Sequence, residues 1–140
     1  GTLYAWGDDT ESKHGILGLG NQYKAIRPCP NSQLFDYMIK NVSLAETHAC
    51  AVDSSGRLFC WGFGPNGELG LENHNNQINI PTIVTKQKQF NIKKAIAYSN
   101  YTVFCSGAGY VYLYGTLQPQ LGKLHFSTNK GSFGGSQPPV

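Results

Sequence analysis

The sequence predicts an all-β fold, and three observations support that prediction. Tyr, Phe, Val and Ile residues lie between clusters of Gly, Asn, Asp and Ser, which is typical of short strands joined by tight turns. Ala, Glu, Leu and Lys do not recur at the 3.6-residue spacing of a helix over any long window. One pattern of aromatic residues and glycines also repeats along the chain at a period of about 53 residues, which indicates a repeat architecture.

Three kinds of anchor define the repeat. The first is an aromatic residue followed by glycine, which occurs as Trp6-Gly7, Trp61-Gly62 and Tyr114-Gly115. The second is a Leu-Gly pair, whose glycines are Gly18, Gly70 and Gly122. The third is a pair of stretches that align without a gap, "THACAVDSSGRLFCWG" and "NYTVFCSGAGYVYLYG". The last copy has diverged, because Tyr replaces Trp. The positions expected to carry the structure of the repeat are Trp6, Gly7, Gly18, Gly20, His48, Gly56, Trp61, Gly62, Gly67, Gly70, Gly109, Tyr114 and Gly115.

Each copy reads as strands joined by turns. Val42–Val52 is expected to be one strand with apolar or small side chains on both faces, and Ala95–Cys105 is expected to be its counterpart in the next copy. The turns Asp53–Gly56 and Ser106–Gly109 end in glycine, which suits the positive φ of a bulged hairpin loop. Return strands are then expected over Arg57–Trp61 and Tyr110–Tyr114.

The connections between these hairpins are polar and contain proline, at Pro28, Pro30 and Pro81. Because proline cannot donate to a strand ladder, we expect these segments to form edge strands, at the outer part of each unit, and surface connections. The insertion Asp8–Gly15 is longer than its counterpart in the next copy and is expected to be an exposed loop.

A period near 50 residues with strands in every unit is typical of a propeller blade or a solenoid turn. Strands that are apolar on both faces favour the propeller, in which each blade packs on two neighbours. We therefore expect a partial β-propeller of two to three four-stranded antiparallel blades in residues 1–122, with repeats at about 3–57 and 58–110 and an incomplete one at 111–122. The Gly-, Ser- and Pro-rich residues 123–140 are expected to form an irregular loop or linker.

These motifs resemble the repeat of the regulator of chromosome condensation family. The resemblance rests on the Trp-Gly and Gly-x-Leu-Gly motifs, the proline-containing connection and the small-residue strand before the next Trp-Gly, and it covers about residues 1–122. It implies a seven-bladed β-propeller, of which this chain holds two blades and a fragment. Either these residues are a window on a longer protein, which is the interpretation we favour, or another chain supplies the remaining blades.

No catalytic, metal or cofactor site is expected. His14 and His74 lack an acidic or thiol partner at a useful spacing, and His48 is expected to be a hydrogen-bonded core residue. The four cysteines form no C-x-x-C pair, which argues against zinc: they are Cys29, Cys50, Cys60 and Cys105. Cys50 and Cys60 are open to two interpretations. They are either a bridge across a hairpin in an oxidising compartment or, as we favour, buried small side chains of a reduced intracellular protein.

Two charged segments are candidates for binding a partner. The run "KQKQFNIKK" carries four lysines and no acidic residue: Lys86, Lys88, Lys93 and Lys94. It is either a solvated connection or a surface that steers an acidic partner. Asp8 and Asp9, with Glu11, form an acidic cluster in the expected loop. The net charge of +3 is too small to favour nucleic acid, and no apolar run reaches the roughly 18 residues of a membrane span.

We therefore expect a non-catalytic scaffold that mediates protein–protein interaction within a larger assembly, inside the cell, in the cytoplasm, the nucleus or at the cytoskeleton. The resemblance offers an alternative, guanine-nucleotide exchange on a small GTPase, which the founding member of the family performs. A propeller enzyme is a third class, but these 140 residues hold no catalytic constellation for it. The scaffold is favoured because catalytic residues are absent and the connections are polar and variable.

Overall fold

The structure, a computed structural model, describes residues 1–71, 75–84 and 91–116. In these ranges it contains three antiparallel sheets of two, four and three strands, and one short 3-10 turn, η1, at Ser32–Leu34. The strands are β1 (Tyr4–Asp8), β2 (Lys24–Pro30), β3 (Ile39–Leu44), β4 (His48–Asp53), β5 (Leu58–Phe63), β6 (Gln77–Ile83), β7 (Ile92–Tyr98), β8 (Tyr101–Ser106) and β9 (Val111–Gly115). The predicted all-β fold is confirmed.

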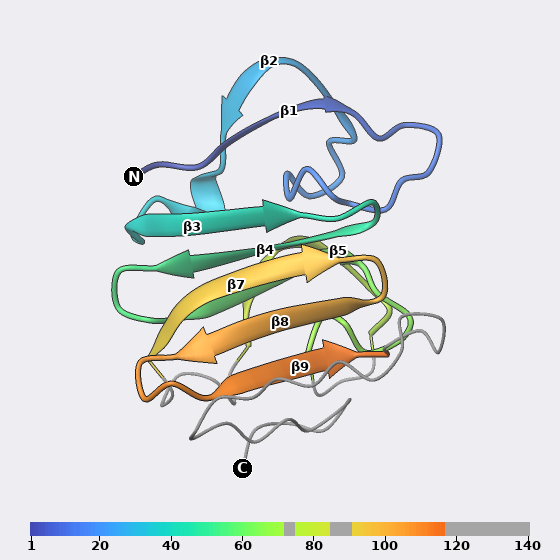
Figure 1. The fold of residues 1–140 in the computed structure, drawn as a ribbon. Helices are drawn as coiled ribbons and strands as arrows, with labels where there is room; N and C mark the ends of the chain where they lie inside the picture. Colours follow the sequence, from blue (N-terminus) through green and yellow to red (C-terminus); the bar gives the residue numbers. More distant parts are fainter. Residues whose placement is uncertain (72–74, 85–90, 117–140) are drawn as a thin grey trace.

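The repeat maps onto the sheets in a simple way. The sheet β3-β4-β5-β6 is a complete four-stranded blade in which every neighbour is antiparallel and consecutive in the chain. The pair β1-β2 corresponds to the last two strands of this blade, and β7-β8-β9 corresponds to its first three. In Figure 1 the complete blade lies between the two partial ones. The predicted partial propeller is therefore present, with one full and two partial blades in the described ranges.

The complete blade is buried on both faces. All residues of β4 are buried, and alternate residues along β4 and β5 point to opposite sides of the sheet. Ala49, Ala51, Phe59 and Trp61 pack toward the first sheet, where Leu3 and Ile16 meet them. Their neighbours Cys50, Val52, Leu58 and Cys60 pack toward the third sheet, against side chains that include Ala95 and Phe104. The two-sided apolar pattern of the sequence therefore reflects a sheet held between two others.

The prediction of a single strand over Val42–Val52 was wrong. The chain turns at 45–47, where the amide of Ala45 donates to the carbonyl of His48 at 2.9 Å, so β3 and β4 form a hairpin. The expected single strand over Ala95–Cys105 breaks in the same way, between Tyr98 and Tyr101. Neither break carries glycine or proline, although Ser99 and Asn100 at the second break are residues that favour turns. The hairpins add the innermost strand of each sheet, β3 and β7.

The other predicted strands and turns of the described ranges lie where the sequence placed them, whereas the expected loop or linker at 123–140 lies outside the described residues. Gly56 closes the turn after β4, donating to the carbonyl of Asp53 at 3.1 Å, and β5 follows. Pro28 and Pro30 lie in β2, and Pro81 lies in β6, which is the last strand of its sheet. The proline-containing segments are thus the outer strands, as predicted.

The first two aromatic-glycine corners are β-bulges. The register shifts between Ala5 and Gly7 in β1, and between Cys60 and Gly62 in β5. Gly62 has a φ of 103°, and a Cβ on it would lie 2.7 Å from the Cα of His48 on the neighbouring strand. A side chain is therefore excluded twice, by the backbone conformation and by the close approach of β4.

The cysteines of the described ranges are free thiols. Cys50 and Cys60 face each other across β4 and β5 and are both buried. Burial raises the pKa of the Cys50 thiol to about 12 and also raises that of Cys60, because an apolar surrounding disfavours the thiolate. These two residues are small core side chains in this structure, which agrees with the favoured interpretation.

Candidate interaction surface

Neighbouring blades are joined by a contact between the Leu-Gly loop of one sheet and the aromatic residue of the next, and we call this contact a latch. The Leu-Gly loop of the first sheet receives Trp61 of the second: the indole Nε1 donates to the carbonyl of Ile16 at 2.8 Å. Gly18 lies so close to the indole that a Cβ there would be 2.9 Å from Nε1. Gly70 meets Tyr114 of the third sheet in the same manner, since a Cβ on Gly70 would lie 2.5 Å from the ring. Each blade therefore holds the aromatic corner of the next.

A buried chain of hydrogen bonds supports the second latch, in which Gly70 contacts Tyr114. The Thr102 hydroxyl donates to the carbonyl of Glu68 at 2.8 Å, and it lies 2.9 Å from Nε2 of His48. Because the hydroxyl proton is committed to Glu68, Thr102 accepts from His48, so the imidazole carries its proton on Nε2. Nδ1 is buried and has no hydrogen-bond partner among the residues that the structure describes. Desolvation lowers the pKa of His48 to about 4, which keeps it neutral at pH 7.

The inner strands of the second and third blades are joined by side chains. Asn41 and Ser43 of β3 accept hydrogen bonds from the amides of Ala95 and Ala97 of β7, each at 3.0 Å. The edge of β7 that does not pair with β8 thereby finds acceptors, although no strand ladder forms there. The contact also fixes the register between the two strands, so Lys40, which precedes Asn41, lies beside the lysines at the start of β7.

These lysines form a basic patch, which we define as Lys40, Lys93 and Lys94. Lys40 and Lys93 occupy matching places, because the ladder shifts register between Ile39 and Asn41 in β3 and between Ile92 and Lys94 in β7. All three are exposed. The ion pairs formed in the described ranges are Lys24–Asp8 and Arg57–Asp53, so no lysine of the basic patch has a described acidic partner within 4.0 Å.

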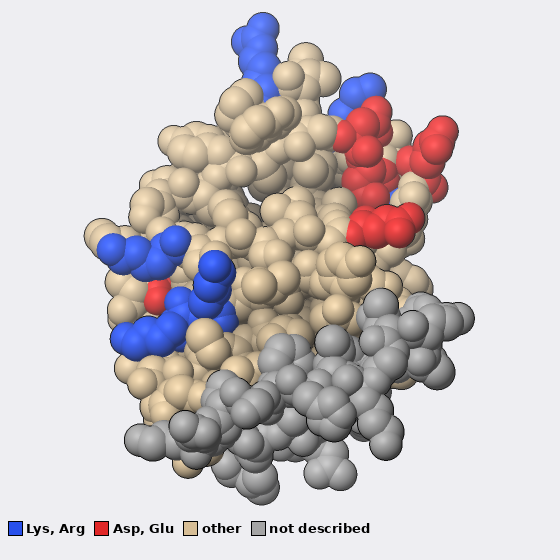
Figure 2. Space-filling model, in the orientation of Figure 1, with Lys and Arg blue, Asp and Glu red and all other residues tan. Residues whose placement is uncertain are grey.

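Arg57 lies on the same side of the molecule but is neutralised. Its Nε donates to Asp53 at 2.5 Å, and its guanidinium lies 4.6 Å from the centre of the Tyr37 ring. Asp53 is itself buried and also accepts from the amides of Ser55 and Arg57. Figure 2 shows Lys and Arg side chains gathered on the side where β3 and β7 begin, and acidic side chains on the side where β1 ends. Basic side chains therefore predominate on one side of this face and acidic side chains on the other.

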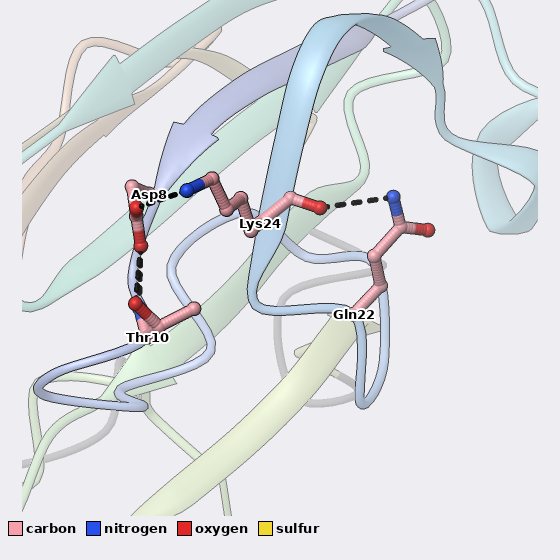
Figure 3. A network of polar contacts seen from close by, with 4 residues as sticks. All are labelled: Asp8, Thr10, Gln22 and Lys24. Atoms are coloured by element: carbon pink, nitrogen blue, oxygen red, sulfur yellow. Dashed lines mark hydrogen bonds and ion pairs between the residues drawn. The ribbon is translucent and has the colours of Figure 1, made fainter.

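The acidic side is built around the loop after β1. Asp8 pairs with Lys24 at 3.1 Å and accepts from the hydroxyl and the amide of Thr10 (Figure 3). The hydrogen bonds from Thr10, followed by the contact with Lys24, lower the pKa of Asp8 to about 2. In the same view Gln22 donates to the carbonyl of Lys24 at 3.2 Å, which ties β2 to the loop.

Asp9 differs from Asp8 because its carboxylate turns inward. It accepts from the amides of Gly15, His14 and Ile16, at 2.7, 3.2 and 3.3 Å, and is only 8% exposed. Asp9 therefore orders the loop that holds Trp61 and offers little to a partner. The expected exposed loop is exposed at its tip, residues 10–13, and anchored at its base.

The structure places the predicted partner-binding residues in two groups. Lys93 and Lys94 join the basic patch, Asp8 and Asp9 lie at the opposite end of the strands, and Lys86 and Lys88 lie outside the described residues. Sequence reasoning missed Lys40, although it stands 53 positions before Lys93 at the same place in the repeat. The described ranges contain no group of His, Cys, Asp and Glu that could hold a metal ion, and none of their helices is long and apolar enough to cross a membrane.

Comparison with known proteins agrees with this architecture. The family model described as the regulator of chromosome condensation (RCC1) repeat matches residues 55–106, and a second model of the same repeat matches residues 39–68. The ultraviolet-B receptor UVR8 of Arabidopsis thaliana is 29% identical over 112 residues, which are 80% of this chain and 24% of the receptor. The human protein described as probable E3 ubiquitin-protein ligase HERC3 is 26% identical over 126 residues, 89% of this chain and 12% of that protein.

Two solved structures share the fold. Human WBSCR16 superposes with a TM-score of 0.74 at 22% identity and covers 83% of this chain and 29% of its own. The Saccharomyces cerevisiae protein Prp20p, whose structure was described with its binding properties to Gsp1p and histones, gives a TM-score of 0.69 at 24% identity and covers 91% of this chain and 31% of its own. The chain thus spans less than a third of each of these relatives.

Proposed function

Because the chain belongs to the regulator of chromosome condensation repeat family, we propose that it is a non-catalytic propeller module that binds other proteins inside the cell, and that the basic patch contacts an acidic surface of a partner. The observation that carries the proposal is the presence of three exposed lysines at one end of two adjacent inner strands, without a described acidic partner. The proposed compartment rests on the family and on the free buried thiols.

The position of the basic patch suits binding better than a set of mobile surface lysines would. Lys40 and Lys93 are bulge residues on strands whose relative register is fixed by Asn41 and Ser43. Their backbone positions are therefore set before a partner arrives, which reduces the ordering cost of binding. Three like charges without an acidic partner among the described residues also create a local positive potential that raises the association rate of an acidic partner.

A charge-reversal experiment tests the proposal. In the full-length protein we expect Lys40→Glu, Lys93→Glu and Lys94→Glu, made together, to weaken binding of a fluorescein-labelled poly-glutamate peptide by at least ~10-fold and to flatten its salt dependence, because the screened attraction is removed. The matched control reverses Lys13, Lys24 and Arg27, which changes the net charge equally at another place. Equal weakening by the two triple variants contradicts a localised site, and no weakening by the first shows that the basic patch is inert.

Nucleotide exchange on a small GTPase is the second candidate function. It is favoured by the likeness to Prp20p, which was described with its binding to Gsp1p. The release of fluorescent nucleotide from a panel of loaded small GTPases, measured with the full-length protein, separates the two candidates. Acceleration supports exchange, whereas unchanged release across the panel leaves the binding module as the function that the basic patch supports.

A further inference from the structure

The loop between β5 and β6 carries the single Asn-Gly pair of the sequence, Asn66-Gly67. Both residues are exposed, whereas Glu68 and Leu69, which follow them, are each only 1% exposed. Asparagine is a labile residue in water, because the main-chain nitrogen of the next residue attacks its side-chain amide carbon. The attack is least hindered when the next residue is glycine, since glycine has no Cβ and its backbone is the most permissive.

The surroundings of Gly67 leave room for this reaction. A Cβ on Gly67 would meet no atom within 4 Å. Among the described residues, no hydrogen bond holds the amide of Gly67 or the side chain of Asn66. The fixed point of this part of the loop is the amide of Asn66, which donates to Oε1 of Glu68 at 2.6 Å. The attacking nitrogen and the side-chain amide are therefore not held apart by a described contact.

The preceding copy of the repeat differs at each of these points. The counterpart of Asn66-Gly67 is His14-Gly15, so the side-chain amide is missing there. The amide of Gly15 donates to Oδ2 of Asp9 at 2.7 Å, and a Cβ on Gly15 would collide with Asn79. The same position of the repeat is therefore bonded and crowded in one copy, and open and reactive in the other.

We propose that Asn66-Gly67 is a site of spontaneous deamidation, at which Asn66 is converted to aspartate or isoaspartate. The Gly67 nitrogen gives its proton to a base of the solvent and bonds to Cγ of Asn66, and the side-chain nitrogen leaves as ammonia, so that a cyclic succinimide forms. Water then opens the ring: attack at Cγ gives aspartate, whereas attack at the main-chain carbonyl carbon of Asn66 gives isoaspartate. Water is the co-reactant, and the inference does not depend on the proposed function.

Isoaspartate at this position alters the loop that holds Tyr114. It routes the main chain through the Cβ of the residue, which lengthens the loop between two anchored points. One is the bond from the amide of Asn66 to Glu68, and the other is the bond from the amide of Gly70 to the carbonyl of Gly67 at 3.0 Å. It also adds a carboxylate close to that of Glu68, and the two groups repel each other. The conversion therefore displaces Glu68 and Gly70 and weakens the second latch.

Peptide mapping of the full-length protein tests the site. After incubation in a mildly alkaline buffer, mass spectrometry measures the converted fraction at Asn66 and at Asn31, which also precedes a small residue, Ser32. Asn31 is 1% exposed, donates to the carbonyl of Gly18 and accepts from the amide of Gln33. We expect Asn66 to convert at least ~10-fold faster than Asn31, because a buried and bonded side chain must first be released by local unfolding.

A synthetic peptide of the loop, "GPNGELG", gives the rate of conversion without the fold. A rate at Asn66 of the protein within ~10-fold of the peptide supports the proposal, whereas a slower rate shows that the loop protects the residue and overturns it. Asn66→Gln is the matched control, because it keeps a side-chain amide but closes a larger ring slowly. It should remove the signal that an isoaspartyl carboxyl methyltransferase detects in the loop peptide of the aged protein.

The effect on the latch is measured separately. Asn66→Asp adds the negative charge without lengthening the main chain, and it is compared with the isoaspartate fraction purified from aged protein. In urea unfolding we expect the isoaspartate form to have a lower midpoint than Asn66→Asp, because only the longer main chain displaces Gly70 from Tyr114. Equal midpoints would overturn the link between the conversion and the latch.

Discussion

His48 links two blades through the hydrogen bond that its Nε2 donates to Thr102, and burial disfavours the charged form of its ring. The imidazole is 0% exposed, its Nε2 donates to Thr102, and a proton added to Nδ1 would be buried away from water. The folded protein therefore resists protonation of His48 down to a pH of about 4, whereas the unfolded chain takes up the proton near the ordinary pKa of 6.5.

This difference predicts an acid-sensitive interface. Above pH 6.5 both states are neutral and His48 adds no pH dependence, whereas between 6.5 and about 4 the unfolded chain binds the extra proton and stability falls. The loss levels off below pH 4 at about 3 kcal/mol. Chemical denaturation as a function of pH measures it in the full-length protein. His48→Gln retains a donor for Thr102 but does not titrate, so its stability should fall less over this window, and parallel curves would contradict the prediction.

Two glycines of the Leu-Gly loop share a backbone conformation but differ in their surroundings, because only one of them contacts an aromatic ring. Gly67 and Gly70 both have positive φ values, 88° and 65°. A Cβ at Gly67 meets nothing within 4 Å, whereas one at Gly70 meets the ring of Tyr114. The two positions therefore share the backbone strain and differ in packing.

Alanine at each position separates the two effects. We expect Gly67→Ala to cost about 1 kcal/mol, from the left-handed backbone conformation alone. Gly70→Ala should cost about 2 kcal/mol more, because Tyr114 must move out of its slot. Urea unfolding of the two variants measures the difference directly. Equal losses would mean that the loop does not hold Tyr114 in solution.

At the scale of the whole molecule, the equivalent loop carbonyl in two copies of the repeat accepts a hydrogen bond from a different donor in each latch. The carbonyl of Ile16 accepts from the indole of Trp61, and its repeat counterpart, Glu68, accepts from the hydroxyl of Thr102. Thr102 stands where the preceding blade has Ala49, and Tyr114 stands where it has Trp61. The loss of the indole donor is thus accompanied by the gain of a hydroxyl donor on the adjacent strand.

A double-mutant cycle tests this compensation. Trp61→Tyr removes the donor to Ile16, and Ala49→Thr supplies a hydroxyl at the place that Thr102 occupies in the next blade. We expect the pair to be at least about 1 kcal/mol more stable than the sum of the single changes, since a buried carbonyl regains its partner. The free energies of unfolding of the four proteins give the coupling. Additive losses would show that the two substitutions in the repeat are unrelated.

The sequence by itself determined the kind of unit and the position of its corners. Local chemistry was enough for these predictions. A bulge with positive φ requires glycine, and a strand buried between two sheets requires a run of apolar residues, so both features are visible in the sequence. It did not reveal the β3-β4 and β7-β8 turns, whose residues 45–47 and 99–100 contain no glycine or proline. The break is imposed by pairing, since Val42–Leu44 align with Ala49–Ala51 only if the chain reverses between them.

Only the tertiary structure decided which copies of the repeat touch. Lys40 lies near Lys94 and Trp61 enters the preceding loop, because the sheets stack with one register. That register is set by contacts between residues about one repeat apart, and the side chains on both sides determine it jointly. Local propensity carries no information about it, so a periodic sequence predicts the blades while packing between blades creates the surface.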